Sequence, residues 1–200
     1  AIKIRTLELL SVFDMLCLVI LIVIQTLAAM KMAVLNKLLE QRAYTDTHTG
    51  LPNKSACEEL LNNKETVGKH TACIMFDLNN LKIINDTKGH LMGDQLILNF
   101  ARLLRNVIPQ KDFVGRYGGD EFMVVIYNTS KAEIEDILKQ LSREKDRLNS
   151  SGNNMPIDYA CGWAISDADS ECTIQMLLDK ADYYMYENKQ SRKKSEQSLK

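Results

Sequence analysis

The most continuous apolar stretch of the chain covers residues 9–30. The polar residues within it are Ser11, Asp14, Gln25 and Thr26. As a helix, a stretch of this length spans about 30 Å, the thickness of the hydrocarbon core of a bilayer. Its centre, residues 15–24, contains no polar residue and therefore offers no polar helical face, which argues against an amphipathic helix of a soluble protein. The pattern predicts a transmembrane helix within a first segment, residues 1–30.

Basic residues flank this stretch on both sides, with a small excess after it at Lys31, Lys37 and Arg42. The excess favours a cytoplasmic location for the residues that follow, and attachment to the inner or cell membrane. The alternative is a buried dimerisation helix, because Asp14 is costly in lipid unless it is paired or near an interface. The chain does not begin with Met, so we expect an upstream sensor region that precedes this sequence.

Apolar residues continue at helical spacing through residues 31–45, with Val34, Leu35, Leu38 and Leu39 forming a narrow seam. Such a seam is typical of a helix that pairs with a copy of itself. The segment therefore predicts a linker helix that sets how two downstream domains face each other.

Helical and strand-like patterns alternate after this linker. We expect strands at 71–77, 112–117, 121–127 and 156–165, and helices at 54–63, 79–86, 92–107, 130–148 and 172–189. Asn53 and Ser130 are suitable helix N-caps. The alternation predicts an α/β sandwich, and the charged end of the chain, 187–200, is expected to be disordered.

Composition excludes some classes of function. The formal net charge of −1 gives no reason to expect a nucleic-acid partner. The cysteines are scattered through the chain without a C-x-x-C pair. They are therefore expected to be free thiols in a reducing compartment, not a disulfide framework or a zinc site.

The run 116–122 reads Arg-Tyr-Gly-Gly-Asp-Glu-Phe and lies between two predicted strands. Gly118 and Gly119 allow a tight turn and leave the backbone open to a ligand. The carboxylates of Asp120 and Glu121 are the oxygen ligands that Mg²⁺ prefers. The run predicts a hairpin tip that binds a divalent cation; a solvent-exposed acidic hairpin is the alternative.

A second carboxylate, Asp77, ends the buried strand upstream. Polar groups just past the end of a strand are where open α/β sheets bind ligands. If the two strands are neighbours, Asp77 and Asp120 can share one metal ion. Alternatively, Asp77 caps the helix that follows it.

Further polar residues follow Asp77. Asn85 and Asp94 pair an amide with a carboxylate and could read the edge of a purine base, while Lys82 offers a charge to phosphate. Their structural alternatives are a turn residue and a helix-stabilising carboxylate. His90 and Lys189 could equally be a packing histidine and a solvated lysine.

Together these motifs resemble the GGDEF domain, the diguanylate cyclase family, over residues 43–195. The motifs that carry the resemblance are an opening motif at 46–54, the run 77–82 with Asn85-Asp86, Gly89-His90 and Gly93-Asp94, the signature 118–122, and Ala181-Asp182, Tyr186 and Lys189 in the closing helix. The resemblance implies a mostly antiparallel central sheet flanked by helices, similar to the nucleotidyl cyclases and the polymerase palm. It places the cyclase domain at 46–195 and leaves 196–200 as a disordered tail.

The resemblance also implies roles for individual residues. Mg²⁺, or alternatively Mn²⁺, would be held by Asp77, the Leu78 carbonyl, Asp120 and Glu121. Guanine would be read by Asn85 and Asp94, with His90, Gly118 and Gly119 in the substrate pocket. Phosphates would be contacted by Lys82, Lys189 and Lys193. Asp120 and Glu121 would be the catalytic residues, without an assignment of which carboxylate is the base.

The reaction of the family joins two GTP molecules into cyclic di-GMP and releases pyrophosphate. Because one domain binds one GTP, the resemblance implies a homodimer. The apolar stretch 9–30 predicts that this dimer is tethered to the membrane. Two alternatives remain open: an inactive module that binds GTP or a partner, and a related cyclase with relaxed nucleotide choice.

Three positions depart from the family pattern. His48 stands where Leu is usual and is expected to loosen the opening turn. Arg192-Lys193-Lys194 replaces the usual Gly-Arg-Asn, so Lys193 or Arg192 would have to supply the phosphate contact. Pro109 replaces the Arg of an Arg-x-x-Asp motif that binds product in many members, so feedback inhibition is expected to be lost.

Overall fold

A computed structural model describes residues 2–63, 67, 70–151, 155–166 and 172–198. The side chains of 2–11, 40–41 and 192–198 are not described. The chain divides into two units, Ala1–Ala43 and Tyr44–Lys200.

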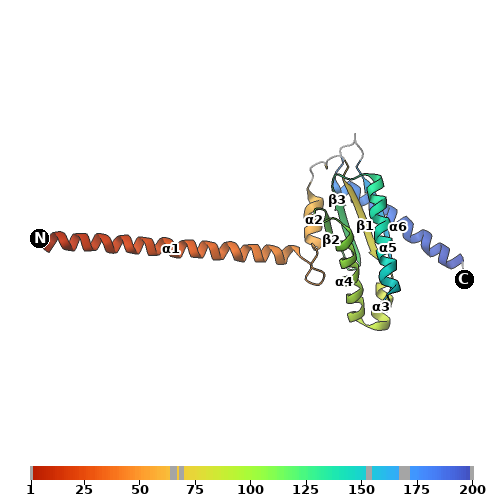
Figure 1. Cartoon of the computed structure of the whole chain (residues 1–200), viewed down its shortest axis with the longest axis horizontal. Coiled ribbons are helices and arrows are strands. Elements are labelled where there is room, and N and C mark those ends of the chain that lie inside the picture. Colours follow the sequence, from red (N-terminus) through yellow and green to blue (C-terminus); the bar gives the residue numbers. More distant parts are fainter. Residues whose placement is uncertain (1, 64–66, 68–69, 152–154, 167–171, 199–200) are drawn as a thin grey trace. The chain divides into compact units, whose positions relative to one another are not determined.

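Residues 2–43 of the first unit lie in one uninterrupted helix, α1 (Ile2–Tyr44), drawn in red and orange in Figure 1. From Val12 onwards it is long and apolar enough to cross a membrane. Its large apolar side chains are exposed throughout this part, including Val34, Leu35 and Leu38 in the predicted linker. The apolar stretch and the linker thus form a single helix without a break between them.

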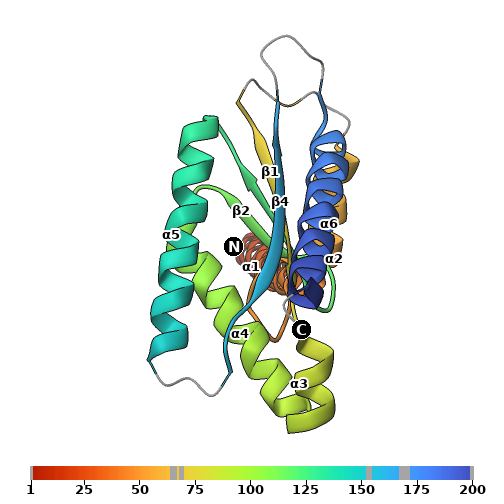
Figure 2. The same ribbon diagram turned by 90° about the vertical axis from the view of Figure 1, so that its right-hand side faces the viewer.

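The second unit is built on a four-stranded antiparallel sheet in the order β2-β3-β1-β4. The strands are β1 (Ala72–Leu78), β2 (Phe113–Arg116), β3 (Glu121–Ile126) and β4 (Tyr159–Ile165). The helices are α2 (Lys54–Asn62), α3 (Leu81–Lys88), α4 (His90–Val107), α5 (Lys131–Ser150) and α6 (Ile174–Ser198). Figure 2 shows the helices on both faces of the sheet. The expected sandwich of an antiparallel sheet between helices is confirmed.

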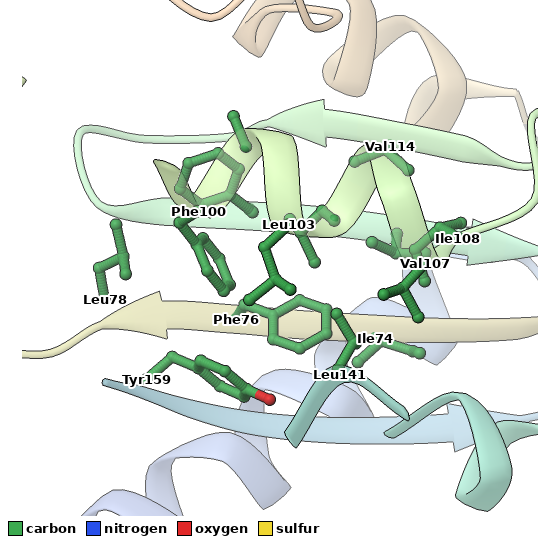
Figure 3. Packing of buried hydrophobic residues seen from close by; sticks show 14 of the residues in the cluster. Ile74, Phe76, Leu78, Phe100, Leu103, Val107, Ile108, Val114, Leu141 and Tyr159 are labelled. Carbon is green, nitrogen blue, oxygen red and sulfur yellow. The ribbon is translucent and has the colours of Figure 1, made fainter. Parts of the chain in front are cut away.

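Two hydrophobic clusters hold the layers together. One joins α4 and α5 to the sheet through Ile74, Phe76 and their neighbours, and the other joins α2 and α6 through Cys73 and Met75. Every residue of β1 is buried because the strand is covered on both faces, which explains its continuous apolar sequence. In the first cluster, the ring of Phe76 packs edge-on against Phe100 and Tyr159, with centroids 5.7 and 5.5 Å apart (Figure 3).

Local sequence signals place three of the helix ends. The Asn53 side chain accepts a hydrogen bond from the Ala56 amide at the start of α2. Ser130 and Glu133 form a reciprocal capping box at the start of α5. Helix α4 ends at Val107, two residues before Pro109, as expected.

Two elements differ from their predicted bounds by more than two residues. Strand β4 begins at Tyr159 and not at 156, because the side chain of Asn149 hydrogen-bonds both the amide and the carbonyl of Ile157, each at 2.8 Å. Helix α6 continues to Ser198. Residues 187–198 thus lie in a helix, where Glu, Lys, Gln and Arg are good helix formers; the expected disordered tail at 196–200 stays a prediction, and residues 199–200 lie outside the described part.

Candidate functional site

The signature forms the expected hairpin tip between β2 and β3. The amides of Tyr117 and Gly118 donate to the Glu121 carbonyl at 2.8 and 3.2 Å, which closes the turn. A Cβ at Gly118 would lie 2.5 Å from Oε2 of Glu121, so a side chain there would push the carboxylate aside. Gly119 is exposed and has open space around its Cα. The two glycines therefore leave room for the Glu121 carboxylate and expose bare backbone at the tip.

Strand pairing brings the two carboxylate motifs together. In the β1–β3 register, Asp77 lies directly opposite Glu121. One residue further, the Leu78 amide donates a 2.9 Å hydrogen bond to the Asp120 carbonyl. The antiparallel sheet thus gathers the predicted metal-binding positions Asp77, Leu78, Asp120 and Glu121 at one end of two neighbouring strands.

Negative charge accumulates at this end of the sheet. Burial raises the pKa of the Glu121 carboxyl above its ordinary value, and the charges of Asp120, Asp77 and Asp182 raise it further. The positive charge of Lys189 lowers the pKa of Glu121. Glu121 is therefore a carboxylate in a partly buried acidic environment that a cation would stabilise.

Lys189 of α6 already places one cation in this environment. Its Nζ lies 2.6 Å from Oδ1 of Asp77. The Asp77 side chain is 13% exposed and that of Lys189 is 32% exposed, so the ion pair is largely shielded from water. This contact places Lys189 at the acidic cluster, on a predicted metal ligand; its predicted phosphate contact stays a prediction.

The acidic cluster provides the right atoms for Mg²⁺, which takes carboxylate and carbonyl oxygens. Within the described part of the chain, however, no group of three or more acidic, histidine or cysteine side chains is arranged so that it could hold a metal ion. Asp77 points its carboxylate at Lys189. The cluster therefore supplies the kind of oxygen ligands that a divalent ion takes, but Asp77 is engaged by Lys189 in this structure, and metal binding here stays a prediction.

The predicted base-reading residues lie on the α3–α4 helical pair. Asn85 is half-buried on α3, and its side chain occupies the space that a Cβ at Gly93 of α4 would need. Asp94, the next residue of α4, is exposed. Close packing at Gly93 therefore brings the helix segments that carry the amide and the carboxylate side by side, with both residues accessible.

The remaining candidate site residues lie on α3, α4 and α6. His90 is exposed as the first residue of α4, and Lys82 is exposed near the start of α3. Lys193 lies in the backbone of α6, but its side chain and that of Arg192 are outside the described part. The phosphate contacts expected of Lys193 or Arg192 remain predictions.

The sequence prediction missed an ion pair that links the opening motif to the hairpin. Nη1 of Arg116 lies 3.2 Å from Oδ2 of Asp46, and Nη2 of Arg116 donates to the Gly119 carbonyl at 2.8 Å. Burial alone would raise the pKa of Asp46, but hydrogen bonds from Thr49 and the charge of Arg116 outweigh it and lower the pKa. The Asp-x-x-Thr spacing could have indicated the Asp46–Thr49 turn. No local signal could have indicated Arg116 as its partner.

The opening turn is intact despite His48. The Asp46 amide donates to the Leu51 carbonyl and the Gly50 amide to the Asp46 carbonyl, both at 2.8 Å. Gly50 has a φ of 69°, a conformation that glycine adopts at little cost. The backbone of the turn is therefore not disrupted by the histidine.

The acidic cluster has a testable effect on stability. Glu121→Gln should raise the melting temperature of the full chain, without metal at pH 7, by about 1–3 °C. The wild-type carboxyl, with its raised pKa, favours the fold only when protonated, and this contribution is lost as the pH rises through the folded pKa. The difference between variant and wild type should therefore shrink toward pH 4.5, the ordinary Glu value. Calorimetry across pH 4–8 measures it; a variant less stable than wild type at pH 7 would contradict the acidic-cluster account.

Comparison with known proteins agrees with this geometry. Residues 43–195 match the model of the GGDEF family, described as diguanylate cyclase, GGDEF domain. The chain is 32% identical over 164 residues to the signaling protein YkoW of Bacillus subtilis, covering 78% of this chain and 20% of YkoW. It is 30% identical over 165 residues to diguanylate cyclase DgcP of Escherichia coli, covering 80% and 48%. Cyclic di-GMP phosphodiesterase PdeR of Escherichia coli is 34% identical over 101 residues, covering 50% and 15%.

Solved structures give the same result for the fold. The coiled coil and GGDEF domain of DgcB from Caulobacter crescentus, in complex with c-di-GMP, aligns with a TM-score of 0.71 at 22% identity, covering 84% of this chain and 91% of that one. The GGDEF domain of TpbB, or YfiN, from Pseudomonas aeruginosa aligns with a TM-score of 0.61 at 30% identity, covering 74% and 89%. The chain spans half or less of the curated relatives named above. The match over 43–195, with the signature at the hairpin tip, shows that the chain belongs to the GGDEF family of diguanylate cyclase domains.

Proposed function

We propose that this chain is a diguanylate cyclase that condenses two GTP molecules into cyclic di-GMP and releases pyrophosphate. The observation that carries the proposal is the gathering of Asp77, Leu78, Asp120 and Glu121 at one end of β1 and β3, opposite the lysine of α6. A cluster of hard oxygen ligands beside a lysine suits a triphosphate and its divalent ion.

Each part of the site has a role in this reaction. Asn85 and Asp94 hold the guanine edge, and Gly118 and Gly119 let the nucleotide approach the backbone of the hairpin. Lys189 and Lys82 contact phosphate oxygens, with Lys193 as a further contact. When bound by Asp77, the Leu78 carbonyl, Asp120 and Glu121, Mg²⁺ offsets charge on the phosphates and lowers the pKa of the attacking 3′-hydroxyl. Asp120 or Glu121 accepts the proton of that hydroxyl.

The reaction requires two copies of the domain. Each 3′-hydroxyl attacks the α-phosphorus of the other nucleotide, and one copy of the site binds one GTP. The exposed apolar seam at Val34, Leu35 and Leu38 of α1 supplies a surface on which two copies pair. We propose that residues 9–30 anchor this dimer in the membrane with the catalytic domain in the cytoplasm, because the large apolar side chains between Val12 and Met30 are exposed.

An inactive, nucleotide-binding module is the second candidate. It is favoured by the ion pair that occupies Asp77 and by the matches to phosphodiesterases such as PdeR. Intact acidic residues at 77, 120 and 121 favour the enzyme.

One incubation separates these functions. The full chain in detergent micelles is mixed with GTP, ATP or both in the presence of Mg²⁺, and products are resolved by chromatography. Cyclic di-GMP from GTP alone supports the cyclase. GTP binding without product identifies the inactive module, and products that contain adenine identify relaxed nucleotide choice.

Product feedback should be absent. At the position of the product-binding Arg the chain has Pro109, which offers no guanidinium to grip guanine or phosphate. Asp112 of the same window is engaged within the fold, because its Oδ1 accepts a 3.1 Å hydrogen bond from the Tyr127 amide. Initial rates with micromolar cyclic di-GMP added should equal those without it. Strong non-competitive inhibition would show that another surface binds product.

A further inference from the structure

Strand β4 forms one end of the sheet. Within the described part of the chain its only strand neighbour is β1. Figure 2 shows β4 facing the viewer, with α5 on one side and α6 on the other. The outer edge of β4 therefore lies between two helices.

A cavity of about 550 Å³ lies along this edge. Its lining includes five consecutive residues of β4, 161–165. Successive strand residues point to opposite faces of a sheet, so a cavity lined by five in a row follows the strand edge and not one face. Trp163 belongs to the core on the α4–α5 side and Ala164 to the core on the α2–α6 side, which agrees with this placement. Five residues of strand span about 16 Å. We call this cavity, along 161–165, the β4 groove.

The β4 groove carries positive charge. Beyond the strand, its lining residues are Lys131 of α5 and Lys180, Tyr184 and Asn188 of α6, and no lining residue is acidic. Lys131 lies 4.0 Å from Glu135 of its own helix, but both side chains are largely exposed and the pair is weak. No ion pair is recorded for Lys180 among the described residues. Lys131 and Lys180 therefore lie on α5 and α6, the two helices that flank the strand edge.

Close packing leaves the edge as the accessible side of the strand. A Cβ at Gly162 would collide with the backbone of α6 at Met185 and Ala181, so α6 covers that face of β4 directly. Asn188, one of the α6 residues that line the groove, is followed by Lys189, which pairs with Asp77. An occupant of the groove would therefore contact the helix turn that carries the ion pair of the site.

We propose that the β4 groove binds an extended, carboxylate-bearing segment of a partner protein, which adds to the sheet beside β4. Backbone hydrogen bonds along a strand edge supply affinity in this mode of recognition, and flanking side chains supply specificity. Lys131 and Lys180 select acidic side chains on the added strand. The basic run at 192–194 of the chain itself does not suit a groove flanked by lysines.

Trp163 makes the proposal directly measurable, because it is the only tryptophan of the chain. The full chain in detergent micelles is titrated with a short peptide of alternating Glu and Val while Trp163 fluorescence is recorded. We expect a saturable change. The same peptide with N-methylated backbone amides keeps its charge but cannot pair as a strand, and should not bind. A matched peptide of alternating Lys and Val should not bind either.

Charge reversal tests the two lysines. The double variant Lys131→Glu, Lys180→Glu should weaken binding of the acidic peptide at least about fivefold. Lys54→Glu with Lys139→Glu, at exposed lysines outside the groove, is the matched control and should bind as wild type does. Circular dichroism of both variants should match wild type.

Several outcomes would overturn the proposal. Equal binding of the N-methylated peptide would show recognition of charge and not of a strand. No saturable change with the acidic peptide would mean that the lysines protect the edge from pairing. A response of Trp163 to GTP but to no peptide would identify a nucleotide site. These results are independent of whether the chain makes cyclic di-GMP.

Discussion

Asp120→Asn and Asp77→Asn should each reduce cyclic di-GMP synthesis more than about tenfold while leaving the fold intact. Each substitution removes one carboxylate from the site whose cation must offset the charge of the triphosphate. Asp77 is buried and Asp120 is half-buried, yet the amide has nearly the same shape as the carboxyl, so packing is preserved. Product chromatography from GTP measures the activity, and far-ultraviolet circular dichroism reports the fold.

The matched control for these variants is Asp136→Asn. Asp136 is exposed on α5, where it pairs with Lys139, and it has no role in the proposed site. It should retain wild-type activity. If either Asp77→Asn or Asp120→Asn keeps more than about a tenth of the activity with wild-type circular dichroism, the metal-binding assignment is wrong.

Lys189→Met should raise the affinity for Mn²⁺ and lower the rate of cyclic di-GMP synthesis. Without nucleotide, Mn²⁺ should bind about tenfold more tightly, because the variant removes the ammonium group that donates a hydrogen bond to Oδ1 of Asp77. With GTP, synthesis should fall at least about tenfold, because the phosphates lose the charge of the lysine. Electron paramagnetic resonance of Mn²⁺ gives the first quantity and product chromatography gives the second.

A lysine with only a structural role would not change Mn²⁺ affinity and cyclic di-GMP synthesis in opposite directions. Lys139→Met, at an exposed lysine of α5, should alter neither quantity. Lys189→Arg keeps the positive charge and should restore weaker Mn²⁺ binding. Unchanged Mn²⁺ affinity in Lys189→Met would show that the ion pair does not compete with the metal.

Local pattern predicted most of the elements because each is set by nearby residues. Strand β3 follows its apolar run, and α5 begins at the capping residue Ser130. Strand β4 was predicted to begin too early, since the hydrogen bonds of Asn149 to Ile157 depend on how the preceding helix packs. Helix α6 extends further than predicted because the charged residues beyond 189, although typical of disorder, are also good helix formers.

The candidate site, too, was predicted only in part from the sequence. The family motifs identified the positions, and the β1–β3 register brought Asp77 and Glu121 together. The contacts that tune the site join residues far apart in sequence: Lys189 and Asp77 are 112 positions apart, and Arg116 and Asp46 are 70 apart. Neither pair has a local sequence signal. Both depend on the tertiary packing of α6 and of the opening turn.

The concentration dependence of the specific activity tests the central claim most directly. A fragment that begins near Leu39 lacks the apolar stretch, and its pairing should depend on mass action. Its activity should rise more than linearly with concentration. Fusion of a parallel coiled coil before Ala43 should restore activity at low concentration by raising the local concentration of partners. Specific activity that stays constant in a fragment shown to be monomeric would contradict a reaction between two GTP-bound domains.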